Sequence, residues 1–331
     1  MSFTPSTPLI VVVSALGAQG ASVVSAYLQS SDYQIRALTS DPSCDAAVRL
    51  AAKNSRVTVV GVDLSSLESV VAAFHGASFI FAQTVFRPDT FASQGPAAAQ
   101  ALEARHGLNI AEAASKIPSL QHLIWSTLPD AFGVSQGKYN IPHFQAKIPA
   151  EQYLRNPDNG LADKTTYLHV GLYGSNAERW PYLPVYVKGA QKYVITLPCS
   201  PNALIPFVGD ESVNVGLIVQ AILSQPEKTL GKSVLGASEY LSCTDWALAL
   251  SKALKDNVTF AETTLESYEA VWGIAGTEVG LMFRYFNEVQ RDAISVPAII
   301  TPAELGVQES LRSTEQRLQG MDWRDILIQT S

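Results

Sequence analysis

The sequence lacks the markers of several protein classes. Its three cysteines, Cys44, Cys199 and Cys243, lie far apart without a CxxC pair, which favours a reducing compartment over a disulfide framework. No apolar run reaches the roughly 18 residues that a membrane-spanning helix needs. The first basic residue is Arg36, so the positively charged start of a secretion signal is missing. We therefore expect a cytoplasmic protein, with the nucleus as an additional location, and no membrane partner.

A concentration of positive charge is also missing. The chain has 23 Lys and Arg against 30 Asp and Glu, a formal net charge of −7, and no basic block. The resulting field would repel a phosphate backbone, so we expect no direct binding of nucleic acid. The histidines His75, His106, His122 and His169 show no metal-ligand spacing, and we expect no metal site.

Apolar residues, by contrast, are plentiful and make up 47% of the 331 residues, enough for a large core. An uninterrupted apolar run such as residues 9–13 is typical of a strand buried on both faces. Further strands are expected at 33–39, 57–62, 78–82, 122–126 and 166–170, with helices at 21–29, 45–53, 67–74, 100–115 and 144–154. This alternation predicts an α/β fold with a Rossmann-type, doubly wound parallel sheet.

The regular alternation weakens after Arg155, and the stretch 180–206 is rich in proline and aromatic residues. Two later segments, 244–255 and 265–289, have the pattern of amphipathic helices. The change predicts a smaller, mostly helical C-terminal domain for the substrate. We expect the dinucleotide-binding domain at 1–178, with 207–236 as a segment that could return to it, and the cap domain at 179–206 and 237–331.

Two glycines mark the turn between the first strand and the first helix. Gly17 and Gly20 would let the backbone approach a pyrophosphate at the helix N-terminus. The same spacing also fits a strand-to-helix turn without a ligand. Ser14 stands where a full GxxGxxG pattern begins with glycine, and a serine can take up this turn if its backbone angles stay negative.

Two charged side chains stand late in the second and third strands. Arg36 would bind a 2′-phosphate through charge-assisted hydrogen bonds, which favours NADP over NAD, or is a solvated surface arginine. An acidic ribose ligand is missing here, because Asp41 lies further along. Asp63 either accepts a hydrogen bond from the adenine amino group or caps the helix that starts near Ser65 or Ser66.

The order of these motifs resembles the NmrA-like family of atypical short-chain dehydrogenases/reductases, which is related to isoflavone-reductase-like proteins. The resemblance extends from Leu9 to about Val289 and rests on successive motifs. They are SALGAQGASV, IRALTSDP with Arg36, VTVVGVDLSSLESVVAAFHGA with Asp63, HLIWST with Ser126, IPHFQAKIPAEQYLR with Lys147, IPFVGDESVNVG, and LGKSVLGASEYLSCTDWALALSKAL.

The resemblance implies an NADP(H)-binding domain, a small C-terminal domain and a cleft between them. Family members often carry a second basic residue where this chain has Ser40, which weakens the expected preference for NADP. The implied cofactor contacts are Gly17, Ala18, Gln19 and Gly20 for the pyrophosphate, Arg36 for the 2′-phosphate, Asp63 for the adenine, and Gln83, Thr84, Ser126 and Lys147 near the nicotinamide ribose. The implied substrate contacts are Tyr173 and Asn176.

A histidine and a lysine four residues apart, His143 and Lys147, form an HxxxK pattern. Typical short-chain dehydrogenases have YxxxK, where the lysine lowers the pKa of the tyrosine that delivers the proton. Because histidine titrates near neutral pH, His143 with Lys147 is a candidate catalytic acid/base pair. Alternatively His143 only forms hydrogen bonds and Lys147 anchors the ribose, as in family members thought to bind the dinucleotide without turnover.

Two functions remain open at this point. The first is NADPH-dependent reduction of a small apolar carbonyl, quinone or phenolic substrate. A cleft walled by aromatic residues would favour it, and the candidates, some of which also suit a core, are Trp180, Tyr182, Tyr186 and Phe207. The second is a redox-sensing regulator that binds NADP(H) without turnover and signals to a protein partner. The missing tyrosine and the serine at position 14 favour that alternative.

Overall fold

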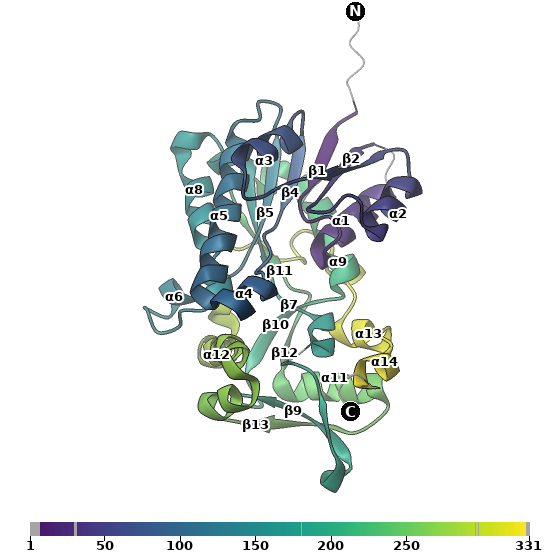
Figure 1. Cartoon of the computed structure of the whole chain (residues 1–331), viewed down its shortest axis with the longest axis vertical. Helices are drawn as coiled ribbons and strands as arrows, with labels where there is room; N and C mark the ends of the chain where they lie inside the picture. The colour runs from purple at the N-terminus through teal and green to yellow at the C-terminus, as the bar shows by residue number, and fades with distance from the viewer. Residues whose placement is uncertain (1–6, 30–31, 180, 295, 297, 329–331) are drawn as a thin grey trace, which may run out of the picture.

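A seven-stranded parallel sheet forms the upper part of the molecule (Figure 1). The structure is a computed structural model and describes residues 7–29, 32–179, 181–294, 296 and 298–328. The strand order is β11-β6-β5-β4-β1-β2-β3. Successive strands are added toward one edge from β1 to β3 and toward the other edge from β4 onward, so the switch point of this Rossmann-type sheet lies between β1 and β4. The strands are β1 (Leu9–Val12), β2 (Gln34–Thr39), β3 (Val57–Gly61), β4 (Phe79–Ala82), β5 (His122–Thr127), β6 (Thr165–Val170) and β11 (Ser233–Gly236).

Helices cover both faces of this sheet (Figure 1). On one face lie α1 (Ala18–Leu28), α2 (Asp45–Lys53) and α9 (Glu211–Leu223), and on the other α3 (Leu67–Phe74), α5 (Pro96–Ser115) and α8 (Ile148–Arg155). Ile10 and Val12 belong to the core under α1 and α9, whereas Val11 and Val13 belong to the core under α3 and α5. Alternate side chains of one strand thus enter opposite cores, which explains the uninterrupted apolar run.

The segment 211–236 lies against this sheet although it follows the start of the C-terminal part. Helix α9 packs on α1, where the Gly216 amide donates to Ser22 Oγ at 2.9 Å. Strand β11 pairs in parallel with β6 from Ser233 to Gly236. The sheet therefore gains its seventh strand from a distant part of the sequence.

The C-terminal part lies below the sheet (Figure 1) and contains strands as well as helices. One small sheet consists of β7 (Leu172–Tyr173), β10 (Leu204–Gly209) and β12 (Glu239–Ser242), and another of β8 (Val185–Val187), β9 (Lys192–Leu197) and β13 (Val258–Glu262). The helices are α11 (Cys243–Leu254), α12 (Leu265–Val289), α13 (Thr314–Gln319) and α14 (Trp323–Ile328). The expected fold class, a Rossmann-type sheet with a smaller and largely helical C-terminal part, is confirmed.

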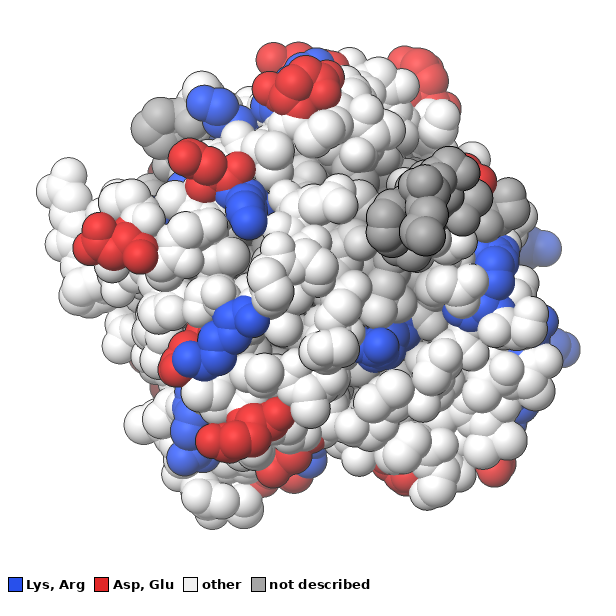
Figure 2. Space-filling view, turned by 90° about the horizontal axis from the view of Figure 1, so that it is seen from above, with Lys and Arg blue, Asp and Glu red and all other residues white. Residues whose placement is uncertain are grey.

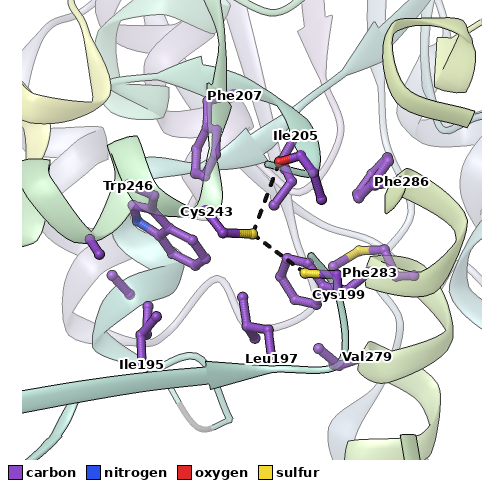
Figure 3. Packing of buried hydrophobic residues seen from close by; sticks show 14 of the residues in the cluster. Ile195, Leu197, Cys199, Ile205, Phe207, Cys243, Trp246, Val279, Phe283 and Phe286 are labelled. Atoms are coloured by element: carbon purple, nitrogen blue, oxygen red, sulfur yellow. Dashed lines mark hydrogen bonds between the residues drawn. The ribbon is translucent and has the colours of Figure 1, made fainter. Parts of the chain in front are cut away.

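A separate core holds the C-terminal part together (Figure 3). Cys199 Sγ and Cys243 Sγ lie 3.4 Å apart inside it, so two cysteines distant in sequence are neighbours in space. Phe207 packs edge-on against Trp246 with ring centroids 5.2 Å apart. Because Phe207 is fully buried there, its expected role as a wall of the cleft is wrong.

The helix expected at 144–154 is interrupted. The structure has a short α7 (Pro142–Gln145), then Ala146 and Lys147, and then α8. Pro149 has no amide hydrogen to donate into a continuous helix, so α8 starts anew with this proline in its first turn. His143 consequently lies in α7, whereas Lys147 lies in the turn after it, as the N-cap residue of α8.

The remaining short helices are α4 (Pro88–Gln94), α6 (Ala131–Val134) and α10 (Pro226–Thr229). Across the described ranges, we find no helix with the length and apolar character needed to cross a bilayer. On the face seen in Figure 2, basic and acidic side chains are scattered in small groups between uncharged ones. That face therefore has no single dominant sign of charge.

Candidate functional site

Two adjoining cavities lie at the carboxyl ends of β1 and β4, the switch point of the sheet. The first has a volume of about 460 Å³ and the second about 540 Å³. Gly17 and Val85 line both, so the cavities meet at the turn before α1 and at the loop after β4. Of the predicted site residues, the first cavity brings together Gly17, Ala18, Gln19, Gln83, Thr84, Ser126, His143, Lys147, Tyr173 and Asn176.

The turn between β1 and α1 is tight. Ser14 has a φ of +54°, so the expectation of negative backbone angles is wrong, and the serine adopts the conformation that glycine usually supplies. Gly20 lies so close to this turn that a Cβ atom would stand 2.3 Å from the Ser14 carbonyl oxygen. Gly20 thus allows α1 to approach β1, whereas Gly17 lines the cavities.

Arg36 does not line either cavity. Its guanidinium donates to the carbonyl oxygens of Ala73 and His75 at 2.8 and 2.7 Å, at the C-terminal end of α3. A cation is favourable there because the unpaired carbonyls carry partial negative charge. Helix α3 runs antiparallel to the strands, so this end lies away from their carboxyl ends. The geometry gives Arg36 a structural role, in disagreement with the predicted contact to a 2′-phosphate.

The second cavity is lined by polar groups at the ends of three neighbouring strands. Ser14 follows β1 and Asp63 follows β3. Thr39 is the last residue of β2, and Ser40 comes directly after it. The Asp63 carboxylate accepts from the Ser65 amide at 2.8 Å, while Ser66 provides the N-cap of α3. Asp63 therefore orders the loop beside the cavity but does not cap the helix itself.

Two further residues of the second cavity were not predicted. Arg87, in the loop after β4, forms a bidentate ion pair with Asp89 at 2.9 and 2.7 Å. His106 Nε2 is 2.9 Å from Ser65 Oγ, and burial followed by the nearby Arg105 lowers its pKa. The cavity thus contains a guanidinium, although it comes from the loop after β4 and not from the second strand, as was expected.

Gln19 connects two other predicted residues across the first cavity. The Ser126 hydroxyl donates to Gln19 Oε1 at 2.8 Å, and Gln19 Nε2 donates to the Tyr173 hydroxyl at 2.7 Å. Burial raises the pKa of Tyr173, so its hydroxyl stays protonated at neutral pH. Because the Tyr173 oxygen accepts from Gln19, its own hydrogen is available to a molecule in the cavity.

Lys147 is buried in an ion pair that the sequence did not predict. Its Nζ lies 2.8 Å from Glu103 Oε1 and 2.9 Å from Thr84 Oγ1, and the Thr84 hydroxyl donates to the same Glu103 oxygen at 2.6 Å. Only 8% of Lys147 and 1% of Glu103 is exposed. The other carboxylate oxygen, Glu103 Oε2, is buried without a hydrogen-bond partner among the described residues.

His143 is paired with a carboxylate from the opposite part of the chain. Its Nδ1 contacts Glu278 Oε1, and its backbone amide donates to the same oxygen at 3.3 Å. Glu278 belongs to α12, 135 residues further along. Phe86 and Phe144 make edge contacts with the imidazole, with centroids 6.0 and 4.7 Å away. The ring is therefore held in place on several sides.

The remaining wall of the first cavity is mainly apolar and includes Phe86, Phe144, Leu172, Tyr182, Met282 and Phe286. Tyr182 confirms one of the predicted aromatic walls. Tyr186 does not line the cavity, and 45% of it is exposed on β8. Trp180, also predicted, lies outside the described residues. Within the described chain, no group of three or more His, Cys, Asp or Glu residues has the arrangement of a metal site.

Fold and site together define a Rossmann-type protein with two adjoining cavities at the switch point of its sheet. A profile of the NmrA-like family matches residues 6–320. The chain belongs to the NmrA-like family.

Named relatives in this family include enzymes and regulators. An NmrA-like family domain-containing oxidoreductase of Aspergillus hancockii is 25% identical over 299 residues, which cover 84% of this chain and 85% of the relative. Among solved structures, NmrA, a negative transcriptional regulator in complex with NADP, superposes with a TM-score of 0.73 at 22% identity, covering 98% of both chains. The NADPH-dependent quinone oxidoreductase QOR2 of Escherichia coli, complexed with NADPH, gives a TM-score of 0.67 at 15% identity, covering 93% of this chain and 98% of that one.

Proposed function

We propose that the protein is an NADPH-dependent oxidoreductase that reduces a small apolar carbonyl, quinone or phenolic substrate. The observation that carries the proposal is the pairing of two half-sites at the switch point. One half is lined by the strand-end loops that contain Asp63 and Arg87, and the other contains His143 and Tyr173 beside aromatic side chains. A dinucleotide that spans both halves would present its reactive ring to the first cavity.

The residues present fit such a cofactor. The first turn of α1, from Ala18 to Gly20, has backbone amides without helical partners, which suit a pyrophosphate above Gly17. The adenosine half would lie in the second cavity beside Asp63. Near the nicotinamide ribose, the unpaired Glu103 Oε2 is a buried acceptor for a hydroxyl group. Bound there, a reduced nicotinamide supplies a hydride.

A preference for NADP over NAD would come from residues of the second cavity, and Arg36 would take no part in it. Thr39 and Ser40 at the end of β2 offer hydroxyls, and neither is an acid that would repel a 2′-phosphate. Arg87 lines the same cavity and is half exposed, so its guanidinium can leave Asp89 for an anion. We propose these three residues as the 2′-phosphate site.

Proton transfer in the proposed reaction falls to His143, supported by the hydroxyl of Tyr173. Lys147 is already neutralised by Glu103, so it serves to hold the ribose and the floor of the cleft. The imidazole of His143 lines the first cavity, and a ring nitrogen of imidazole can give or take a proton. This division of roles differs from the prediction that both residues act as a catalytic pair.

A second candidate is a regulator that senses NADP(H) without turnover and passes its state to a protein partner. The Lys147–Glu103 ion pair favours it, because a neutralised lysine cannot assist a catalytic hydroxyl as in typical short-chain dehydrogenases. Likeness to a transcriptional regulator bound to NADP also supports it.

Spectroscopy of the purified protein separates the two. The protein is mixed with NADPH and a panel of quinones and aromatic ketones, and the absorbance of the reduced cofactor is followed. We expect oxidation of NADPH that is lost in Lys147→Ala and kept in the exposed control Lys53→Ala. Tight NADPH binding with no turnover across the panel would support the regulator. No binding at all would contradict both.

A further inference from the structure

The contact between His143 and Glu278 has the form of an acid/base dyad. Both side chains are largely buried, with 19% of His143 and 10% of Glu278 exposed. His143 lines the first cavity, whereas Glu278 does not. The carboxylate therefore lies behind the imidazole as seen from the pocket. Among the described residues, His143 is the one basic side chain that forms an ion pair with Glu278.

The chain geometry places this carboxylate by an interruption in α12. Gly273 has a φ of +61° within the helix, a backbone conformation that suits glycine, and the helix changes direction there. The segment after the interruption presents Met282 and Phe286 to the cavity. Glu278 stands one turn before Met282 on the same side, which brings it behind His143.

The contact determines which ring nitrogen is free. A carboxylate only accepts hydrogen bonds, so Nδ1 of His143 must carry the hydrogen that Glu278 receives. Nε2 is then the remaining position of the ring for a ligand. Glu278 Oε1 also receives the His143 backbone amide at 3.3 Å, which fixes the carboxylate relative to the peptide as well as the ring.

We propose that Glu278 is a positioning residue that holds His143 with Nδ1 protonated and Nε2 directed to the substrate. The inference rests on the proposed reductase function. When the substrate carbonyl carbon gains a hydride, its oxygen takes the proton from Nε2, and the C=O bond becomes C–OH. The imidazolium becomes a neutral imidazole, while Glu278 keeps its charge and its bond to Nδ1.

The cavity that contains the ring has other charged or titratable groups in its lining. Lys147 with its partner Glu103, Arg179 and Tyr182 line the same cavity as His143. Lys147 and Glu103 compensate each other, and Arg179 is close to Glu178 at 3.9 Å. Glu278 is the carboxylate in direct contact with the imidazole, so its removal should alter His143 more than removal of any other acid.

Nuclear magnetic resonance tests the dyad without relying on turnover. In protein labelled with ¹⁵N-histidine, the His143 signals are assigned by their loss in His143→Gln and followed across pH. We expect a neutral form with the proton on Nδ1, and a smaller fraction of this tautomer in Glu278→Gln, because an amide is a weaker acceptor than a carboxylate. The matched control is Glu288→Gln, which removes another carboxylate of α12 that bonds Lys138 and Tyr139 instead. A proton on Nε2 in the neutral form, or an unchanged tautomer fraction in Glu278→Gln, would overturn the proposal.

Kinetics then separate the dyad from the reductase proposal. If NADPH is oxidised, kcat should fall at least about tenfold in Glu278→Gln with KM nearly constant, and Glu278→Asp should recover part of the loss. A kcat equal to wild type in Glu278→Gln would overturn the positioning role. Absence of turnover in the wild type would instead refute the reductase proposal, while the resonance experiment still decides how Glu278 acts on His143.

Discussion

Two basic side chains of the first cavity, Lys147 and His143, differ in the partner that each has and in the region that supplies it. Lys147 is paired with Glu103 from α5, inside the Rossmann part, whereas His143 is paired with Glu278 from α12 in the C-terminal part. Lys147, Glu103 and His143 all line the first cavity, whereas Glu278 is not part of its lining. The residue proposed to hold the cofactor and the residue proposed to transfer a proton are thus four positions apart in the sequence.

The Lys147–Glu103 pair and the His143–Glu278 pair differ in burial and charge, and this difference indicates a different role for each pair. A buried lysine must remain charged or lose its salt bridge, so the Lys147 pair is a fixed structural and binding element. A histidine can be neutral or charged near neutral pH, so the His143 pair is able to exchange a proton. We therefore expect substitutions in the Lys147 pair to alter stability and cofactor binding, and substitutions in the His143 pair to alter turnover.

The largest expected effect is on stability. Lys147→Met keeps the volume of the side chain but leaves the Glu103 carboxylate buried without its counter-charge, which should lower the free energy of unfolding by about 3–5 kcal/mol. Urea unfolding measures it. The double variant Lys147→Met with Glu103→Leu should recover most of the loss. If the single variant is as stable as wild type, the pair does not have the buried character described above.

The buried histidines of the sheet provide a reference for His143. Burial lowers the pKa of His122 and of His169 to about 4. Both stay neutral in the folded state, so their contribution to stability is complete above pH 6.5 and is lost as the pH falls toward 4, by up to about 3 kcal/mol each.

Urea unfolding at several pH values tests this sign. His122→Gln should reduce the loss of stability between pH 6.5 and 4, because one titrating group is gone. Equal pH dependence in variant and wild type would show that His122 takes up its proton in both states, contrary to its burial beside Thr166 at 2.7 Å.

We expect cofactor affinity to depend on the Lys147–Glu103 pair and turnover to depend on the His143–Glu278 pair. Glu103→Gln should raise the Kd for NADPH about tenfold, because the ribose loses a charged acceptor. His143→Gln should leave that Kd nearly unchanged and lower kcat by about a hundredfold. Calorimetry and steady-state kinetics measure these. A change of the same size in Kd for both variants would contradict the different roles of the two pairs.

The smallest expected effect concerns the turn between β1 and α1, which contains Ser14. Ser14→Gly should stabilise the fold by about 0.5–1 kcal/mol, because glycine adopts a positive φ without the Cβ penalty. Ala21→Gly, at an exposed helical position of α1, is the matched control and should destabilise by about 1 kcal/mol. Loss of stability in Ser14→Gly would contradict the conformation of this turn.

Much of the sheet was predictable because its strands are short, apolar and separated by helical patterns. Strand β11 was not among the expected strands, since its partner β6 lies more than sixty residues before it. The role of Arg36 was misjudged for a related reason. Sequence placed the residue late in a strand, but Arg36 is the third of the six residues of β2, and its side chain reaches the C-terminal end of α3.

The two carboxylates were missed because contacts across the chain decide their importance. Sequence does hold a signal for both. Glu103 stands four residues after Ala99 and four before Gly107, inside the buried stripe of α5. Glu278 stands four residues before Met282 and eight before Phe286. An acid on the apolar face of a helix is a residue to examine, although its partner follows only from the fold.

Titration calorimetry with NADPH tests the central claim most directly. The account predicts saturable binding of one cofactor per chain, weakened in Glu103→Gln and unchanged in His143→Gln. Wild-type protein that binds neither the reduced nor the oxidised coenzyme at millimolar concentration would contradict it.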